Sequence, residues 1–128
     1  MPGVIAIQTG KYLNDTDTEK EIRNWNENLR TSLTELKSFP LITWCDDALF
    51  TSDTLNNFLW VTFTRSNPAT DIHGIESFTL HKHWGCNGPM IIDARIKPHH
   101  APVLVPDAEI ERKIDKLFEK GGSLYRNK

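Results

Sequence analysis

The chain has 128 residues and a formal net charge of −2 at pH 7, with acidic and basic residues interspersed. This length suits one compact domain over residues 1–128, which can bury a core without a metal or a disulfide staple. No run of Lys or Arg is long enough for a nucleic-acid surface, and no apolar segment approaches the roughly 20 residues that span a bilayer.

Two features of the sequence, the cysteines and the N-terminal segment, predict the cellular compartment of the protein. Cys45 and Cys86 lie far apart and form no CxxC pair, which favours a reducing environment. The opening segment "MPGVIAIQTG" has no basic region and only a short apolar run, unlike a secretory signal. We therefore predict a cytoplasmic protein with free thiols.

Two short apolar segments, 3–8 and 41–45, predict strands that are buried on both faces of a sheet. Between them, residues 14–39 have apolar side chains at steps of three and four, which predicts an amphipathic helix. Thr18 and Glu21 fit a capping box at the start of this helix. The apolar positions of the helix are Ile22, Trp25, Leu29, Leu33 and Leu36.

Residues 53–66 show a second helical pattern. Ser52 or Asp53 would cap this helix and Asn67-Pro68 would end it, because the residue before a proline disfavours the α conformation. Its expected inward-facing residues are Leu55, Phe58, Leu59 and Thr62. The elements expected after it are a possible strand over 77–83, a strand over 90–96, an extended proline-rich loop over 97–107 and a last helix over 107–120.

The alternation of strands and helices predicts the fold class. Strands separated by helices of this length indicate an α/β protein with layers of helices on a sheet. We expect a three-layer α/β/α sandwich with a mostly parallel or mixed sheet and a right-handed βαβ start.

A histidine and cysteine cluster, "HKHWGCNGP", raises the question of a metal site. Residues i and i+2 of one strand face the same side, so His81 and His83 could reach one ion, with Cys86 as a third ligand. Imidazole and thiolate ligands suit zinc. The fourth ligand would come from Cys45, Asp93, His99 or His100. We favour the alternative, in which these are half-exposed strand residues beside a turn.

Asp46 and Asp47 follow the second predicted strand at its carboxyl end, where α/β proteins place ligands. Paired carboxylates there could hold Mg²⁺ or act as acid and base. Helix caps and solvated loops use the same residues, and we favour that interpretation. The chain contains no glycine-rich phosphate loop between a strand and a helix.

The motifs from residue 41 to residue 100, taken in order, resemble the C-terminal part of the UbiD family of aromatic-acid carboxy-lyases. That part has an apolar strand ending in acids, as in Leu41–Asp47, and then a helix that closes in a "W…TR…P..D" pattern. Pro2-Gly3-Val4 also matches its "PGV" start. The residues that match the helix pattern are Trp60, Thr64, Arg65, Pro68 and Asp71.

The resemblance implies the C-terminal domain of a longer enzyme that uses prenylated FMN, with a divalent metal and a monovalent cation at its phosphate. Such enzymes carry out non-oxidative decarboxylation of aromatic acids, for example a 4-hydroxybenzoate in quinone biosynthesis. Their catalytic Glu–Arg–Glu set lies upstream of the matched region. We therefore assign no catalytic residue here, and we expect the chain by itself to be inactive and to hold no cofactor.

The resemblance also implies that this domain builds the oligomer and closes over the pocket. The candidates for lining the pocket or an interface are Phe78, Leu80, His81, His83 and Trp84. Arg65 and Asp71 are expected to form a fixed structural pair that shapes the loop after the helix. The expected partners are the remainder of the UbiD-like chain, further copies in a homo-oligomer and, in the full-length enzyme, an aromatic acid. The alternatives are a stand-alone oligomerisation or regulatory module and a small zinc-binding domain.

Overall fold

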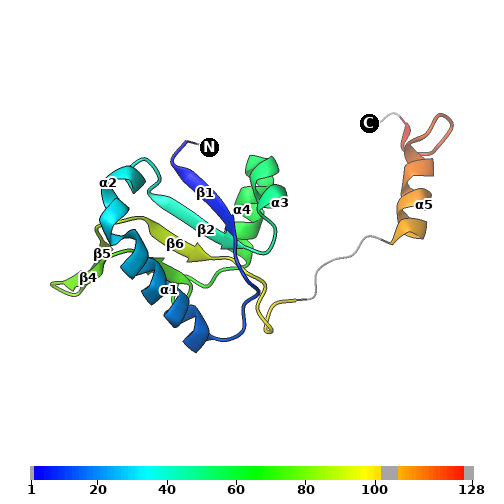
Figure 1. The fold of residues 1–128 in the computed structure, drawn as a ribbon. Coiled ribbons are helices and arrows are strands. Elements are labelled where there is room, and N and C mark those ends of the chain that lie inside the picture. The colour runs from blue at the N-terminus through cyan, green and yellow to red at the C-terminus, as the bar shows by residue number, and fades with distance from the viewer. Residues whose placement is uncertain (1, 102–106, 126–128) are drawn as a thin grey trace.

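The computed structural model describes residues 2–101 and 107–125. At its centre lies a four-stranded sheet in the order β1-β2-β6-β3 (Figure 1). Strands β1 (Val4–Gln8), β2 (Leu41–Cys45) and β6 (Met90–Asp93) are parallel, and β3 (Ile72–Gly74) pairs antiparallel with β6 at one edge. The predicted α/β fold is confirmed, and its sheet is mixed.

Helices cover both faces of this sheet, which gives the expected three layers (Figure 1). One face carries α1 (Asp15–Leu29), the short 3-10 helix η1 (Arg30–Ser32) and α2 (Leu33–Leu36). The other face carries α3 (Ala48–Asp53) and α4 (Leu55–Thr64).

The alternation of side chains along β2 divides the core into two parts. Ile42 and Trp44 point toward α1 and pack in a cluster with Ile91 of β6. Cys45 points the other way and packs against Val61 of α4. Because successive strand residues face opposite sides, one apolar strand supplies both halves of the core.

Two helix starts differ from the predictions because other residues provide the caps. The side chain of Asn14, not Thr18, caps α1 by accepting a hydrogen bond from the Asp17 amide. The predicted helix over 53–66 is α4, which Thr54 caps in place of Ser52 or Asp53, and the short helix α3 that precedes it was not predicted. Asp47 caps α3, since its carboxylate accepts from the Phe50 amide at 2.9 Å.

The predicted strand over 77–83 is a separate hairpin. Its strands β4 (Ser77–Leu80) and β5 (His83–Cys86) pair antiparallel and extend away from the four-stranded sheet (Figure 1). The two turn residues, His81 and Lys82, have φ values of 50° and 67°. Positive φ at both central residues is typical of the tight turns that match the twist of a hairpin, although most such turns use glycine or asparagine.

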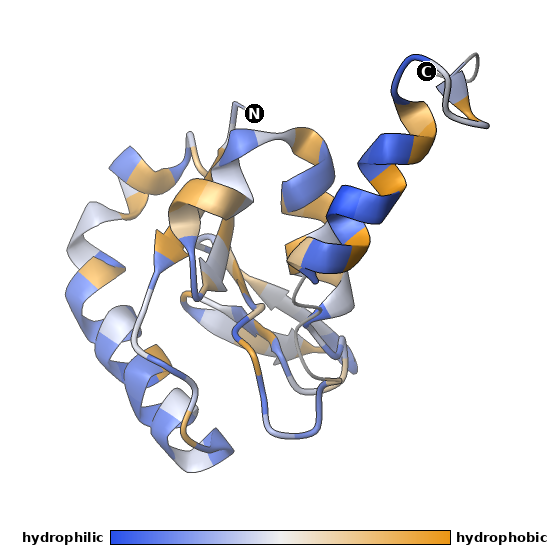
Figure 2. Ribbon diagram, turned by 90° about the vertical axis from the view of Figure 1, so that its right-hand side faces the viewer, coloured by the Kyte–Doolittle hydropathy of each residue, from blue (hydrophilic) through white to orange (hydrophobic). Residues whose placement is uncertain are grey.

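The last helix, α5 (Ala108–Phe118), is capped by Asp107 and confirms the expected C-terminal helix. Figure 2 shows α5, the helix that leads to the C label, with blue and orange bands along its length. Its apolar side chains Ile110, Ile114 and Leu117 are exposed. Part of the predicted loop over 97–107 lies outside the described residues. No helix in the described ranges is both long and apolar enough to cross a membrane.

Candidate functional site

Three charged side chains at the carboxyl end of β6 turn into the protein instead of toward solvent. Asp93, Arg95 and Lys97 are 0%, 1% and 3% exposed. Burying a charge is costly unless it is paired and hydrogen-bonded, so each of these groups needs partners from nearby segments. With Asp71, which is also buried, they form what we call the buried charge cluster.

Arg95 uses all five of its guanidinium N–H groups. Two of them bind Asp93 in a bidentate arrangement, with Nε 2.9 Å from Oδ1 and Nη2 2.8 Å from Oδ2. The others donate to Glu21 Oε2 at 2.8 Å, to Thr18 Oγ1 at 2.9 Å and to the Gly10 carbonyl at 3.2 Å. Thr18 and Glu21, which the sequence suggested as a capping box, therefore bind Arg95 instead.

These contacts determine the charge state of Asp93. Burial disfavours its carboxylate, but the hydrogen bond from Arg95 and the positive charges of Lys97 and Arg95 outweigh that effect. The pKa of Asp93 is therefore held below its ordinary value. The carboxylate stays ionised and serves as the fixed anion of the cluster.

Lys97 joins the cluster to the loop after α4. Its Nζ lies 2.8 Å from the Asp93 carbonyl oxygen and 3.2 Å from Asp71 Oδ2. It also donates to the Arg65 carbonyl at 3.4 Å. Asp71 Oδ2 in turn accepts from the Asn67 amide at 2.7 Å, so this one lysine holds both ends of the loop.

The expected pair between Arg65 and Asp71 is not formed. Arg65 Nη1 lies 3.6 Å from Asp46 Oδ2, and its guanidinium lies 4.9 Å from the centre of the Trp60 ring. Asp71 instead pairs with the buried Lys97, whose Nζ lies 3.2 Å from its Oδ2. Thr64 bonds back to the Trp60 carbonyl. Most of the matched motif thus has structural contacts at the end of α4, and Pro68 lies in the turn that follows.

Asp46 and Asp47 also have structural roles. Asp46 Oδ2 accepts from the Ile96 amide at 2.8 Å, and Asp47 caps α3. Both carboxylates at the end of β2 therefore bind this chain's own groups, which agrees with the favoured interpretation.

A cavity of about 260 Å³, to which polar and charged residues contribute, lies beside the buried charge cluster. His73 Nε2 is buried there and has no hydrogen-bond partner among the described residues, and burial lowers the pKa of His73. Tyr12 donates to Asp15 Oδ1 at 2.6 Å, and this bond raises the pKa of Tyr12 to about 12. The cavity thus offers a neutral imidazole and hydroxyl groups, which suit a water or another small polar molecule. Its lining residues are Tyr12, Asp15, Thr18, Glu19, Thr70, Asp71 and His73.

The structure brings the five candidate pocket or interface residues together on one hairpin. Phe78 lies across Gly85, where an added methyl group would come within 2.8 Å of the ring. The Trp84 ring likewise lies against Gly74. Leu80, Trp84 and Phe78 are all exposed, so the hairpin presents apolar side chains on an outer surface. The candidates on it are Phe78, Leu80, His81, His83 and Trp84.

The structure does not bring His81, His83 and Cys86 together. His81 lies in the turn, so it does not share a strand with His83 as the metal hypothesis required. His83 and Cys86 lie at opposite ends of β5, and the Cys86 thiol donates to the Gly88 carbonyl. In residues 2–101 and 107–125, no three His, Cys, Asp or Glu side chains are grouped closely enough to hold a metal ion.

Large apolar side chains are also exposed on α3 and α4, and we call the surface that they form the outer α3–α4 face. Leu49 is 84% exposed and Phe63 is 61% exposed. Leu55 and Leu59, which were expected to face inward, lie on this face instead, while Phe58 and Thr62 are buried as expected. The sequence of α4 has apolar residues on all sides, and a helix of this kind is normally buried. This pattern could have predicted an apolar surface on α4. The face comprises Leu49, Phe50, Leu55, Leu59, Trp60 and Phe63.

Sequence comparisons relate this chain to much longer proteins. A Chlamydia pneumoniae protein that is named as a subunit of 4-hydroxybenzoate decarboxylase is 37% identical over 85 residues, which are 66% of this chain and 14% of that protein. An uncharacterized protein of Chlamydia muridarum is 32% identical over 102 residues, which are 80% of this chain and 18% of the relative. No family model matches the chain. The chain spans less than a fifth of the length of these relatives.

Proposed function

We propose that this chain acts as the C-terminal domain of a UbiD-like carboxy-lyase, whose reaction is the non-oxidative decarboxylation of an aromatic acid such as a 4-hydroxybenzoate. The observation that carries the proposal is the 37% identity to the Chlamydia pneumoniae protein over 66% of this chain. The mixed α/β sheet agrees with the fold that the family resemblance implied. Two residues of the matched motif also form structural contacts: Arg65 pairs with Asp46, and Asp71 pairs with Lys97.

In this proposal the domain has an assembly role and a covering role. Large exposed apolar patches on soluble proteins mark interaction sites, and the outer α3–α4 face is such a patch. We propose that the remainder of the enzyme chain covers this face. The β4–β5 hairpin, with Phe78, Leu80 and Trp84, would reach over the substrate pocket or a neighbouring protomer.

The catalytic chemistry would then lie in the remainder of the enzyme. Asp71 and Asp93 are paired with cations of this chain, and Asp46 and Asp47 are bound to its amides. These residues therefore do not fit a divalent metal, and we derive no catalytic step from them. Prenylated FMN, with its divalent metal and monovalent cation, is proposed to bind outside this chain.

A chimaera tests the proposal directly. This chain would replace the matching segment of the Chlamydia pneumoniae protein, and carbon dioxide release from 4-hydroxybenzoate would be measured after loading with prenylated FMN. We expect activity from the chimaera and none from the 128-residue chain alone, because effective catalysis needs the cofactor and the acid–base groups in one site. Turnover by the chain alone, or a folded chimaera that binds the flavin without turnover, would overturn the proposal.

A matched pair of variants tests the docking of the outer α3–α4 face within that chimaera. Leu59→Asp places a charge on the outer α3–α4 face, whereas Asn24→Asp places the same charge at an exposed polar position of α1, on the other side of the sheet. We expect Leu59→Asp to impair assembly and turnover and Asn24→Asp to leave both unchanged. Equal behaviour of the two variants would contradict the proposed docking of this face.

A stand-alone assembly module is the second candidate. The apolar stripe of α5, with Ile110, Ile114 and Leu117 exposed, favours it because such a stripe needs a partner. Self-association of the chain, together with a chimaera that cannot bind the flavin, would favour this candidate over the enzyme domain.

A further inference from the structure

The outer edge of β1 has a free row of backbone hydrogen-bonding groups. β1 is the first strand in the sheet order and pairs with β2 on one side. Within the part of the chain that the structure describes, no strand pairs with its other side. An open strand edge is a template for pairing with another strand.

The hydrogen bonds to β2 show which residues point outward. The Gly3 carbonyl accepts from the Leu41 amide, and the Thr9 amide donates to the Cys45 carbonyl. Odd-numbered residues of this segment therefore direct their backbone groups toward β2. Because these groups alternate along a strand, Val4, Ala6 and Gln8 direct their N–H and C=O groups to the free edge.

This edge lacks the features that normally prevent pairing. The strand sequence is Val-Ile-Ala-Ile-Gln, with no charged residue and no proline. Charged side chains, prolines and bulges are the usual means by which edge strands avoid association. An unprotected edge of this composition is therefore suited to a strand partner.

We propose that β1 pairs antiparallel with β1 of a second copy of this chain, with the two-fold axis at Ala6. The outward residues are spaced evenly about Ala6, so the edge is complementary to itself. Ala6 would face Ala6 of the second copy, and Val4 would face its Gln8, giving roughly six backbone hydrogen bonds. Ile5 would lie opposite Ile7 of the second copy, which extends the apolar side facing α1. The two sheets would then form one continuous sheet.

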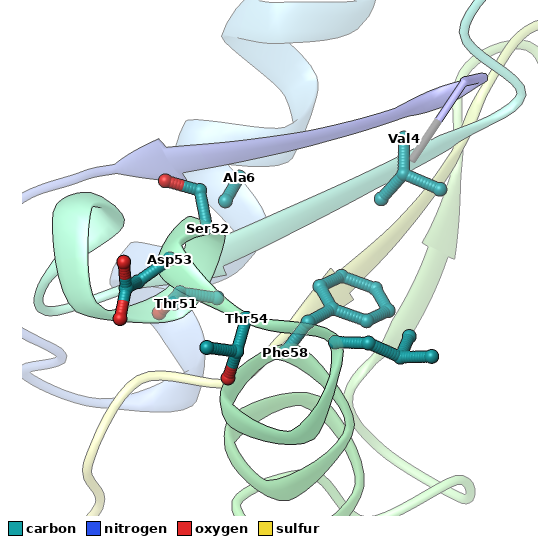
Figure 3. A pocket seen from close by; sticks show the side chains of 8 residues that line it. Val4, Ala6, Thr51, Ser52, Asp53, Thr54 and Phe58 are labelled. Carbon is teal, nitrogen blue, oxygen red and sulfur yellow. The ribbon is translucent and has the colours of Figure 1, made fainter.

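The surroundings of the edge agree with this pairing. Figure 3 shows Val4 and Ala6 bordering a hollow, with Phe58 and the end of α3 across from them. This hollow has a volume of about 220 Å³ and lies beside the same outward-facing residues. The small side chain of Ala6 at the axis lets two copies of the strand approach closely. The hollow gives the second strand's side chains space beside the sheet.

The inference specifies the assembly role and rests on the proposed function only for the expectation that copies of this chain associate. The decarboxylase relationship is tested separately by the chimaera. Edge pairing can therefore fail while the enzyme proposal stands, and the enzyme proposal can fail while copies still pair.

The test uses the 128-residue chain and a proline at the axis. Ala6→Pro removes an amide that β2 does not use, and proline is tolerated on edge strands when its missing N–H faces solvent. We expect the dimer dissociation constant, measured by sedimentation equilibrium, to rise about tenfold or more. Ile72→Pro on β3 is the matched control, because its amide also faces away from β6 at the opposite edge. We expect it to leave the dissociation constant unchanged.

Amide hydrogen exchange on the unmodified chain provides a test that needs no substitution. We expect exchange at Val4, Ala6 and Gln8 to slow as protein concentration rises, while Ile5 and Ile7 stay protected throughout. A chain that remains monomeric at high concentration would overturn edge pairing. So would a folded Ala6→Pro variant that dimerises like the unmodified chain, or a dimer in which the outward amides exchange freely.

Discussion

The carboxyl end of β6 places Asp93, Arg95 and Lys97 almost out of contact with solvent, whereas the outer α3–α4 face leaves six large apolar side chains exposed. The charges inside are fully satisfied by partners within the chain, from Thr18 and Glu21 of α1 to Asp71. The apolar side chains outside have no such cover in the described residues. The first region is thus complete within this chain, whereas the second is open in the described residues, as the proposed docking onto the remainder of the enzyme requires.

Replacing Arg95 should have the largest effect on the free energy of unfolding. It tests whether the buried charge cluster stabilises the fold. Arg95→Met leaves the buried Asp93 carboxylate without its main partner, which should lower the free energy of unfolding by about 3–5 kcal/mol. Urea denaturation measures this change. Arg23→Met is the control, since Arg23 forms only an exposed pair with Glu19 and should cost less than about 1 kcal/mol. A small effect at Arg95 would contradict the proposed role of the cluster.

Acidic pH should lower the free energy of unfolding through the buried charge cluster, because the pKa of Asp93 is lower in the folded chain than in the unfolded chain. The unfolded state then binds more protons at low pH, so stability from this group is present above about pH 4 and is lost as the pH falls through the folded pKa. Denaturation midpoints between pH 2 and pH 6 measure the loss. The Asp93→Asn variant should show a flatter acid profile, and an unchanged profile would count against this assignment.

A smaller effect is expected at Thr18, whose hydroxyl accepts from Arg95 at 2.9 Å. Thr18→Val keeps the side-chain shape but leaves one guanidinium N–H unpaired, at a cost of about 1.5–3 kcal/mol for a hydrogen bond to a charged group. If Thr18 instead acted as a helix cap, α1 would lose helical signal by circular dichroism. The Asn14→Ala variant removes the helix cap of α1 and provides the reference for the loss of helical signal.

The smallest effect is expected on the outer α3–α4 face. Phe63→Ser should change the free energy of unfolding of the isolated chain by no more than about 0.5 kcal/mol, because the side chain is already exposed to water. The buried Phe58 on the same helix provides the contrast, and Phe58→Ala should cost about 3–5 kcal/mol. A large loss at Phe63 in thermal or urea unfolding would show that this face is already packed in solution.

Local patterns were sufficient to predict much of the fold. Strands β1, β2 and β6 are short apolar segments, and α1 and α5 show helical spacing. The hairpin was missed because its turn residues, His81 and Lys82, are not typical of positive φ. The residue spacing in "SFTLHKH" therefore suggested one continuous strand.

The buried charge cluster could not be predicted because its partners are remote in sequence. Thr18 and Arg95 are 77 positions apart, and nothing near either residue indicates the contact. Charges at alternate positions, as in Asp93, Arg95 and Lys97, would usually predict a solvent-facing strand. The pairing of Arg65 with Asp46 was missed for the same reason, since proximity in sequence favoured Asp71.

The position of β6 between β2 and β3 has a consequence for the order in which the chain can fold. Ribosomes deliver β1, β2 and β3 first, but these strands form one sheet only when β6 arrives to join them. Until Lys97 has emerged, Asp71 lacks its cation and the first turns of α1 lack Arg95. Non-local contacts of this kind slow folding. The nascent chain can therefore complete this sheet and its buried charge cluster only after the segment through Lys97 has left the ribosome.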